Sequence, residues 1–472
     1  MRIPHLPATA FIDPEGSNRA EIRDLLVTVV DLLLEHLATA SQRPVSPQVE
    51  EYPGFESIPE DPLPIPLIVE RISFLIRQPR NLAHPGYLGN MESMPATMSL
   101  IAAVIMAATK NNMLGQEMAP FLSAVEPRAL RWFAEQFGLG PQAGGGMLAG
   151  GTLTNLQALT TARNAKLGCH ERGIWNRARA PVLFASEVAH TSLHKAAMVM
   201  GLGRGAVIAV RADENSRMDV EDLRRKVSKS LADGKQEPFC VVATAGTTIT
   251  GNIDPLSDIA CVAREYGLWL HTDAIYGGAL VFSSRYRPRL RGIEHSDSVT
   301  LNLHKWLYSG LTSSLVLFRN FALLEEHFRI AAPYMTSDPQ AANLGEYSLQ
   351  GSRQADVLSL LLTLQHLGRK AFGDLIGDRI GLAETLRSLL IESGVARLSG
   401  ATDTNIVCFR PNAAPADRSL QELQRLLARE AGVCLTTPLY RGETWLKSVL
   451  LNPFTVAADL RRLVSVFSAR TA

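Results

Sequence analysis

The chain has 472 residues, of which 46% are hydrophobic and 20% are charged, and its formal net charge is +1. These values exclude a disordered chain, and the near-neutral charge gives no electrostatic reason to expect a nucleic-acid or anionic-membrane partner. No apolar stretch is long enough to span a bilayer, the N-terminus lacks the apolar core of a signal peptide, and the five cysteines lack metal-site spacing. We therefore expect a large cytoplasmic protein without a metal ion or a membrane partner.

An amphipathic helix is expected near the N-terminus, over about residues 17–42. Leucine and valine recur there at helical spacing, and the pattern stops before Pro44 and Pro47. A proline-rich connector follows. Because the helix precedes the main domain and has a wide apolar face, a surface must cover it, either on its own domain or on a second subunit.

The middle of the chain alternates short apolar runs, rich in β-branched residues, with helix-like stretches. The runs lie at 181–185, 206–210, 239–244, 268–272, 299–302 and 314–318. They are continuously apolar, so we expect strands that are buried on both faces. This pattern predicts an α/β domain around a mostly parallel sheet.

A smaller C-terminal α+β domain is expected after a long helical region. Strands are predicted at 405–410 and 446–451, and a helix at 419–430. The chain should therefore divide into an N-terminal helical segment, a large domain and a small C-terminal domain. Their predicted bounds are 1–80, 81–365 and 366–472.

The run Asn302-Leu303-His304-Lys305-Trp306 places a lysine at the end of a buried strand, and Asp273 ends a similar strand. An amine that can bond to an aldehyde, near a buried carboxylate that can hold a ring nitrogen protonated, is what pyridoxal 5'-phosphate (PLP) needs as an electron sink. We therefore expect Lys305 to carry PLP. For this motif taken alone, an ordinary strand-end lysine is the alternative.

Together these motifs resemble the group II PLP-dependent amino-acid decarboxylases, the family of glutamate and aromatic amino-acid decarboxylases. The resemblance spans about residues 15–465 and includes His271-Thr-Asp273-Ala-Ile-Tyr-Gly-Gly278. It implies the fold-type-I architecture, with a mostly parallel seven-stranded sheet, and a homodimer with the active site at the subunit interface. It also implies that the N-terminal helical segment, residues 1–80, is a dimerisation element that packs against the partner subunit. Leu303 departs from the family, which has a proline before its His-Lys pair.

The glycine-rich run from Gly144 to Asn155 resembles the phosphate-binding segment of the family. Glycines let the backbone approach an anion, and the free amides at a helix start supply donors, reinforced by the helix dipole. The resemblance implies Gly151 and Thr152 as phosphate ligands, with Asn302 and His304 as additional ones. A glycine-rich loop alone would also fit a plain turn.

The segment Ser186-Glu-Val-Ala-His190 resembles the one whose histidine stacks on the cofactor ring. His190 would then exclude water from one ring face and hydrogen-bond the substrate carboxylate. Thr248, in a strand-end turn, would lie near the ring hydroxyl, and Asp254 would cap the following helix. Asp273 should be buried and should remain ionised beside the protonated ring nitrogen.

Tyr334, in Pro333-Tyr334-Met335, occupies the position of a family tyrosine that a mobile loop of the neighbouring subunit offers to the active site. That tyrosine helps to protonate the carbon that has lost CO2, and relatives that form aldehydes tend to lack it. Its surroundings here are typical of a lid. The resemblance thus implies decarboxylation of an L-amino acid to an amine and CO2. Aldehyde synthesis or carbon–carbon lysis on the same scaffold, and a non-catalytic binding protein, are the alternatives.

The substrate side of the site is expected around Asn90, Met91 and Leu114, in segments that resemble those of the family. None of these three side chains is aromatic, so a bulky aromatic substrate is disfavoured. Lys447 stands where the family commonly has an arginine, and lysine is a point charge where arginine can clamp a carboxylate with two hydrogen bonds. Arg353 matches the family and is expected to tie the base of the lid to the large domain.

Overall fold

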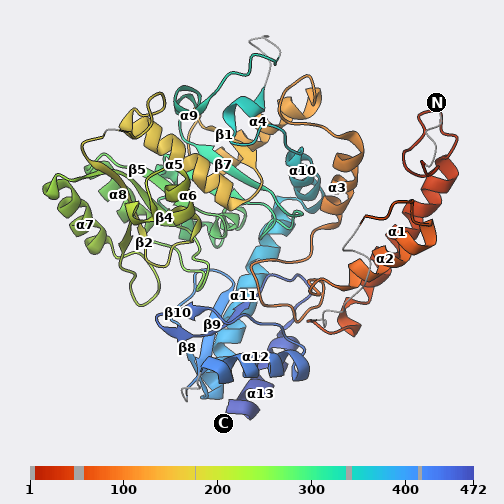
Figure 1. Ribbon diagram of the computed structural model, residues 1–472. Coiled ribbons are helices and arrows are strands. Elements are labelled where there is room, and N and C mark those ends of the chain that lie inside the picture. Colours follow the sequence, from red (N-terminus) through yellow and green to blue (C-terminus); the bar gives the residue numbers. More distant parts are fainter. Residues whose placement is uncertain (1–5, 47–57, 176, 336–342, 413–416, 472) are drawn as a thin grey trace.

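The computed structural model describes residues 6–46, 58–175, 177–335, 343–412 and 417–471. A seven-stranded sheet with helices on both faces forms the large part of the molecule. A smaller sheet lies near the C-terminus, and two helices form an N-terminal arm (Figure 1). The expected α/β class and the seven-stranded sheet are confirmed.

The large sheet has the strand order β1-β7-β6-β5-β4-β2-β3. Its five neighbouring strands from β6 to β3 are parallel to one another, whereas β7 runs antiparallel between β6 and β1. The bounds are β1 Gly144–Leu148, β2 Ala180–Ser186, β3 Val207–Val210, β4 Gln236–Thr244, β5 Trp269–Asp273, β6 Ser298–Asn302 and β7 Ser314–Phe318. Six of these strands lie at the predicted apolar runs.

Strand β1 corrects the interpretation of the glycine-rich run as a loop. The first residues of this run, 144–148, pair with β7 along their whole length. A Cβ atom added at Gly145 would lie 2.0 Å from the carbonyl oxygen of Val316. Glycine is therefore required here by the close approach of two strands, in addition to any role in binding an anion.

Alternate residues of β4 enter two different apolar cores. Val241 and Ala243 pack into one cluster, and Cys240 and Val242 pack into another on the opposite face. Both faces of the sheet are thus buried, which explains the continuously apolar strand sequences. The helices over one face include α4 (Pro120–Gln136), α7 (Val220–Asp233) and α8 (Leu256–Glu265); those over the other include α5 (Gly151–Leu167), α6 (Ser192–Val199) and α9 (Phe321–Phe328).

The C-terminal part has its own apolar core and an antiparallel sheet of order β12-β9-β8. The long helix α11 (Arg369–Ser393) leads into it from α10 (Asp356–Leu367) (Figure 1). Both predicted strands and the predicted helix lie here. The remaining bounds are β8 Ala396–Leu398, β9 Ile406–Pro411, α12 Asp417–Glu430, β10 Leu439–Tyr440, β11 Glu443–Thr444, β12 Leu446–Val449 and α13 Ala457–Thr471.

The N-terminal arm consists of α1 (Arg19–Ala38) and α2 (Ile65–Arg77), which pack against each other and extend away from the body of the chain (Figure 1). Helix α3 (Thr97–Thr109) follows and packs on α10. Five apolar side chains of α1 are between 41% and 58% exposed: Leu26, Val27, Val30, Leu33 and Leu34. Within the described ranges, no helix combines the length and apolarity that a membrane span requires.

Candidate active site

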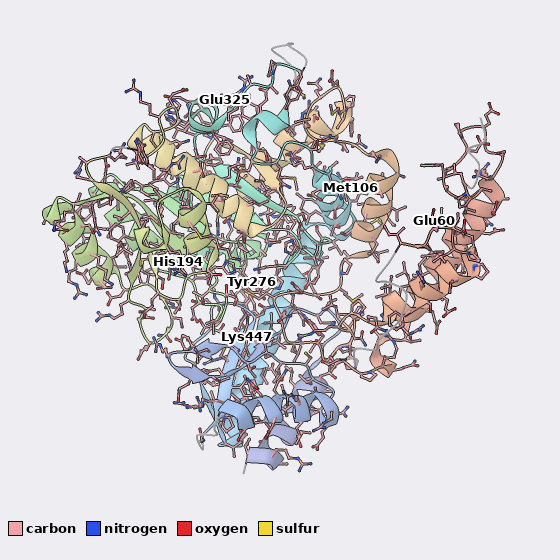
Figure 2. All side chains as sticks on the ribbon, in the orientation of Figure 1. Glu60, Met106, His194, Tyr276, Glu325 and Lys447 are labelled. Atoms are coloured by element: carbon pink, nitrogen blue, oxygen red, sulfur yellow. The ribbon has the colours of Figure 1, made fainter. Side chains whose placement is uncertain are left out.

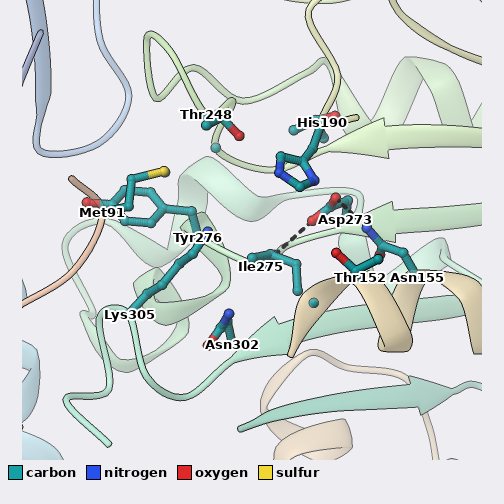
Figure 3. A pocket seen from close by; sticks show the side chains of 13 residues that line it. Met91, Thr152, Asn155, His190, Thr248, Asp273, Ile275, Tyr276, Asn302 and Lys305 are labelled. Carbon is teal, nitrogen blue, oxygen red and sulfur yellow. Dashed lines mark hydrogen bonds between the residues drawn. The ribbon is translucent and has the colours of Figure 1, made fainter. Parts of the chain in front are cut away.

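A cavity of about 160 Å³ lies where β4, β5 and β6 end, at the carboxyl edge of the parallel strands. Ligands of open α/β sheets bind at this edge because loops there can converge on one point. Figure 3 shows the cavity. It is lined by Met91, Gly151, Thr152, Asn155, His190, Thr244, Gly246, Thr248, Asp273, Ile275, Tyr276, Asn302 and Lys305.

Most of the predicted site residues therefore meet in one place, although they come from distant parts of the sequence. The predicted residues that line the cavity are Met91, Gly151, Thr152, His190, Thr248, Asp273, Asn302 and Lys305. His304 lies next to them, and its backbone N–H donates to Asn302 Oδ1 at 3.0 Å. Asn90 and Leu114 are not among the lining residues; the carbonyl of Leu114 accepts from the N–H of Gly345 at 2.9 Å.

Asp273 is 6% exposed, and its carboxylate is held by two hydrogen bonds. Asn155 Nδ2 donates to Oδ2 at 2.9 Å, and the backbone N–H of Ile275 donates to Oδ1 at 3.1 Å (Figure 3). Asn155 lies in the first turns of α5 and was not predicted from the sequence. Its Nδ2 also donates to Ser192 Oγ at 3.0 Å, and its Oδ1 is 3.2 Å from the hydroxyl of Thr300.

A buried histidine completes this network behind the carboxylate. Trp269 Nε1 donates to Ser298 Oγ at 2.9 Å, and the Ser298 hydroxyl lies 2.9 Å from His271 Nδ1. The amide oxygen of Asn155 can only accept, so His271 Nε2–H donates to it at 3.1 Å, and Nδ1 of the neutral ring accepts from the Ser298 hydroxyl. Burial lowers the pKa of His271 to about 4, so this ring is neutral.

His190 has one ring nitrogen fixed as an acceptor. The backbone N–H of Ser192 donates to His190 Nδ1 at 3.2 Å, and the Ser192 hydroxyl lies 2.8 Å from the same atom. The neutral ring therefore carries its proton on Nε2. Burial lowers the pKa of His190, with Asp273 acting in the opposite direction. Nε2–H is thus available as a donor on the residue that forms this side of the cavity (Figure 3).

Lys305 is half-buried at the cavity, and burial lowers the pKa of its ammonium, while Asp273 and Glu92 act to raise it. A lowered pKa increases the share of neutral amine, the form that attacks a carbonyl. Lys305 Nζ lies 5.9 Å from the centre of the Tyr276 ring. That ring stacks on Trp306 with a centroid separation of 5.0 Å and an interplanar angle of 11°.

The start of α5 fits a phosphate group. Gly150 has a φ of +96°, and α5 has no side-chain cap on its free amides. A Cβ atom at Gly151 would lie 2.6 Å from Ile275 Cδ1, so a side chain would crowd the cavity wall. On the other side, Asn302 Nδ2 lies 3.0 Å from His304 Nε2, and burial lowers the pKa of His304 to about 4.

The residues present fit PLP. A half-buried lysine, a buried carboxylate and an uncapped helix start surround one cavity, and these groups match the aldehyde, the ring nitrogen and the phosphate of the cofactor. In addition, the Thr244 hydroxyl is buried at the cavity without a hydrogen-bond partner. In the part of the chain that the structure describes, no group of three His, Cys, Asp or Glu residues could hold a metal ion.

Tyr334 does not line this cavity, and its side chain is 75% exposed. The expected lid extends into residues 336–342, which lie outside the described residues. The role expected of Arg353 fits its geometry: its guanidinium pairs with Glu126 on α4, with Nη1 and Oε2 2.9 Å apart, and both side chains are buried.

Lys447 lies on β12 of the C-terminal part (Figure 2) and contacts the cavity-lining Thr248 without lining the cavity itself. Its Nζ donates to the carbonyl of Thr248 at 2.6 Å, and burial lowers its pKa to about 8.

Asp254 departs from the prediction of a helix cap. Its carboxylate accepts from the backbone N–H groups of Met218 and Thr244, both at 2.7 Å, so it fixes the end of β4 instead of the start of α8.

The fold and the site define a PLP-dependent enzyme. A family profile described as "Pyridoxal-dependent decarboxylase conserved domain" matches residues 54–412. The chain therefore belongs to the pyridoxal-dependent decarboxylase family, and it is a PLP-dependent carboxy-lyase that acts on an L-amino acid. The expected family, cofactor and reaction class are confirmed.

Individual relatives agree with this assignment. L-2,4-Diaminobutyrate decarboxylase of Rhizobium meliloti (strain 1021) is 29% identical over 472 residues, covering 97% of this chain and 93% of the relative. Cysteine sulfinic acid decarboxylase of Homo sapiens is 34% identical over 333 residues, covering 69% of this chain and 66% of the relative. The structure of mouse CSAD in apo form superposes with a TM-score of 0.89 at 25% identity, covering 96% and 99% of the two chains.

Proposed function

We propose that Lys305, Asp273 and His190 carry out the decarboxylation of an L-amino acid to an amine. The observation that carries this assignment is the placement of a half-buried lysine and a doubly hydrogen-bonded carboxylate in one cavity. Lys305 would hold PLP, Asp273 would face its ring nitrogen, and Thr248 would lie near its ring hydroxyl. Gly151, Thr152, Asn302 and His304 would surround its phosphate.

Bound PLP would supply an electron sink for the electron pair that stays on the α-carbon when CO2 leaves. The protein residues orient and protect the reaction. His190 would cover the cofactor ring, exclude water and donate its Nε2–H to the substrate carboxylate. Asn155 and the N–H of Ile275 would hold the buried Asp273 carboxylate in place to face the cofactor ring nitrogen.

We further propose that the chain acts as a homodimer in which Tyr334 serves the cavity of the neighbouring subunit. Tyr334 is exposed and does not line the cavity of its own chain, as this arrangement requires. The exposed apolar face of α1 supports a second copy as its cover, because a monomer rarely leaves such a face in water. The five cysteines form no disulfide, which is consistent with a cytoplasmic location.

The role of Tyr334 can be tested with Tyr334→Phe. Loss of the hydroxyl removes a proton donor, so we expect a lower rate of amine formation and a larger share of aldehyde. Products would be separated by mass spectrometry, with Tyr266→Phe as the control, because Tyr266 lies at the end of α8 and does not line the cavity. An unchanged ratio of amine to aldehyde would contradict the role.

The substrate is proposed to carry a small polar side chain. The relatives named above act on diaminobutyrate and cysteine sulfinate, and Met91 is the one predicted substrate residue at the cavity. The experiment is mass spectrometry after the PLP-loaded protein has been mixed with all common amino acids plus diamino and sulfur amino acids. An amine one CO2 lighter than its parent is expected. An aldehyde as the sole product, or no product from any amino acid, would contradict the proposal.

A further inference from the structure

Tyr276 is an aromatic residue at the cavity that the sequence did not predict and that the proposed mechanism does not use. It lies shortly after β5, directly before the short helix Gly277–Phe282, and is 2% exposed. It lines the cavity beside Lys305, whose Nζ lies 5.9 Å from the centre of the tyrosine ring (Figure 3). Among the described residues, the Lys305 ammonium forms neither a hydrogen bond nor an ion pair. Its contact with this ring is therefore available to restrain the amine.

The hydroxyl of Tyr276 is anchored by Asn405, a residue of the C-terminal part that directly precedes β9. Tyr276 Oη donates to Asn405 Oδ1 at 2.5 Å. The other side of this amide is also fixed, because Asn405 Nδ2 donates to the carbonyl of Leu450 at 2.8 Å. The backbone carbonyl of Asn405 accepts from the N–H of Leu450 at 2.9 Å. Asn405 is fully buried, so a movement of the tyrosine ring would leave buried polar groups unpaired.

One face of the Tyr276 ring is covered as well. The ring stacks on Trp306 with a centroid separation of 5.0 Å and an interplanar angle of 11°. Trp306 is the residue after Lys305, so the stack connects the tyrosine to the segment of backbone that carries the lysine. The ring is therefore held both at its face and at its hydroxyl end.

A fixed ring helps a lysine that has to bond to an aldehyde. A lysine side chain has many rotamers, and restricting them before the reaction raises the rate, because the reacting atoms then meet more often in a productive geometry. The face of an aromatic ring attracts an ammonium group within about 6 Å. The hydroxyl is not suited to donate a proton in this step, because it already donates to Asn405 and burial raises the pKa of Tyr276 well above its usual value.

We propose that Tyr276 is a positioning residue for Lys305: Asn405 fixes the tyrosine ring, and the ring holds the amine where PLP is attached. This inference rests on the proposed attachment of PLP to Lys305, and adds that the C-terminal part helps to build the attachment site. In the attachment step the amine nitrogen bonds to the aldehyde carbon, and the aldehyde oxygen leaves as water with two amine hydrogens. Tyr276 neither gains nor loses an atom.

The test measures how fast PLP becomes attached to the full-length protein purified without it. Samples at saturating PLP are quenched with borohydride at successive times, and mass spectrometry measures the fraction of Lys305 that carries PLP. Tyr276→Leu removes the ring and should slow attachment about 10- to 100-fold. Tyr276→Phe keeps the ring, removes the anchored hydroxyl and should slow attachment about 3- to 10-fold.

A second pair of variants examines the anchor. Asn405→Ala should slow attachment as much as Tyr276→Phe does, and the double variant should be no slower than the slower single variant, because both changes remove the same hydrogen bond. Tyr308→Phe is the matched control. Tyr308 is also buried, its hydroxyl donates to the carbonyl of Leu451 in the C-terminal part at 2.8 Å, and it does not line the cavity. Its attachment rate should stay within about twofold of the wild type, and melting curves would show that each variant is folded.

The outcomes separate this inference from the proposed function. Slower attachment in both Tyr276 variants with the Tyr308→Phe rate intact would support the inference. A wild-type rate in Tyr276→Leu, or equal slowing in Tyr308→Phe, would overturn it and leave Lys305 as the attachment site. Wild-type rates in Tyr276→Phe and Asn405→Ala would overturn the role of the anchor. Absence of PLP from Lys305 in the wild type would overturn the proposed function itself.

Discussion

Two parts of the cavity differ in how completely their polar groups are paired. At the strand ends, Asn155 uses both its amide nitrogen and its amide oxygen in hydrogen bonds to Asp273, Ser192 and His271. On the side of β12, Lys447 donates one hydrogen bond, to the backbone carbonyl of Thr248. The first part is organised before any ligand binds, as suits a resident cofactor, and the second leaves a positive charge for a substrate that binds and departs.

The largest loss of activity is expected from replacing Lys305, because both the cofactor and the substrate depend on this residue. Lys305→Ala removes the amine and should reduce CO2 release at least about 1,000-fold. After borohydride reduction, the intact mass of the wild type should include PLP and that of the variant should not. Lys229→Ala, an exposed lysine of α7, is the control. Covalent PLP in the Lys305 variant would place the attachment elsewhere.

Removing the negative charge of Asp273, at the strand ends, should cause the next largest loss of activity. Asp273→Asn keeps the size of the side chain but cannot stabilise a protonated ring nitrogen. We expect kcat to fall about 100- to 1,000-fold with PLP still attached to the protein, because electrostatic groups of this kind contribute on that scale. Steady-state kinetics and reduced-protein mass spectra measure the two quantities. Full activity would show that the carboxylate is only structural.

Asn155→Ala tests whether the network itself matters. It leaves Asp273 and His271 each without one hydrogen bond, so kcat should fall about 10-fold and the free energy of unfolding by about 1–3 kcal/mol. Asn164→Ala is a matched control from the same helix, since this buried asparagine donates to the carbonyl of His327 and does not line the cavity. It should lose stability while keeping kcat. Equal kcat losses in both variants would contradict a specific role for Asn155.

The smallest expected effect is a dependence of KM on pH that arises from Lys447. Because burial lowers its pKa from 10.5 to about 8, the ammonium is charged below pH about 8 and neutral above it. If it attracts the substrate carboxylate, KM should rise a few-fold as the pH passes 8. Lys447→Arg should abolish that rise, since a guanidinium stays charged.

Lys447 also makes the stability of the fold depend on pH. Substrate binding is expected to weaken as the pH rises, whereas the free energy of unfolding is expected to increase. The unfolded chain keeps this proton up to pH 10.5, so between pH 8 and 10.5 the contribution of Lys447 to the free energy of unfolding increases with pH. Denaturant titrations of the wild type and Lys447→Met measure this slope. Identical slopes would show that the lysine is not perturbed.

The sequence predicted six strands of the large sheet because each is a continuous apolar run. It did not predict β1, whose three glycines carry no hydrophobic signal and of which Gly145 is required by close contact with β7. Asp254 shows a similar limit: the local pattern favoured a cap, whereas one of its two partners, Met218, lies 36 residues away. Long-range contacts of this kind leave no trace in a local pattern.

The residues of the site also divide into those that the sequence could predict and those that it could not. Lys305, Asp273 and His190 stand in ordered motifs and could be predicted from a family resemblance. Asn155 could not, since its link to Asp273 spans 118 residues. The departure at Leu303 has a physical explanation: its backbone N–H donates to the carbonyl of Ser313 at 3.0 Å, a bond that proline cannot make.

The apolar face of α1 also has a consequence for how this protein behaves at low concentration. If a second copy covers that face, the folded state is favoured by mass action, and the melting temperature rises with the protein concentration. In a dilute sample the subunits would then separate, and the N-terminal arm would lose its cover, before the large sheet unfolds. Activity measured at nanomolar protein would report the association of subunits as well as the chemistry of the cavity.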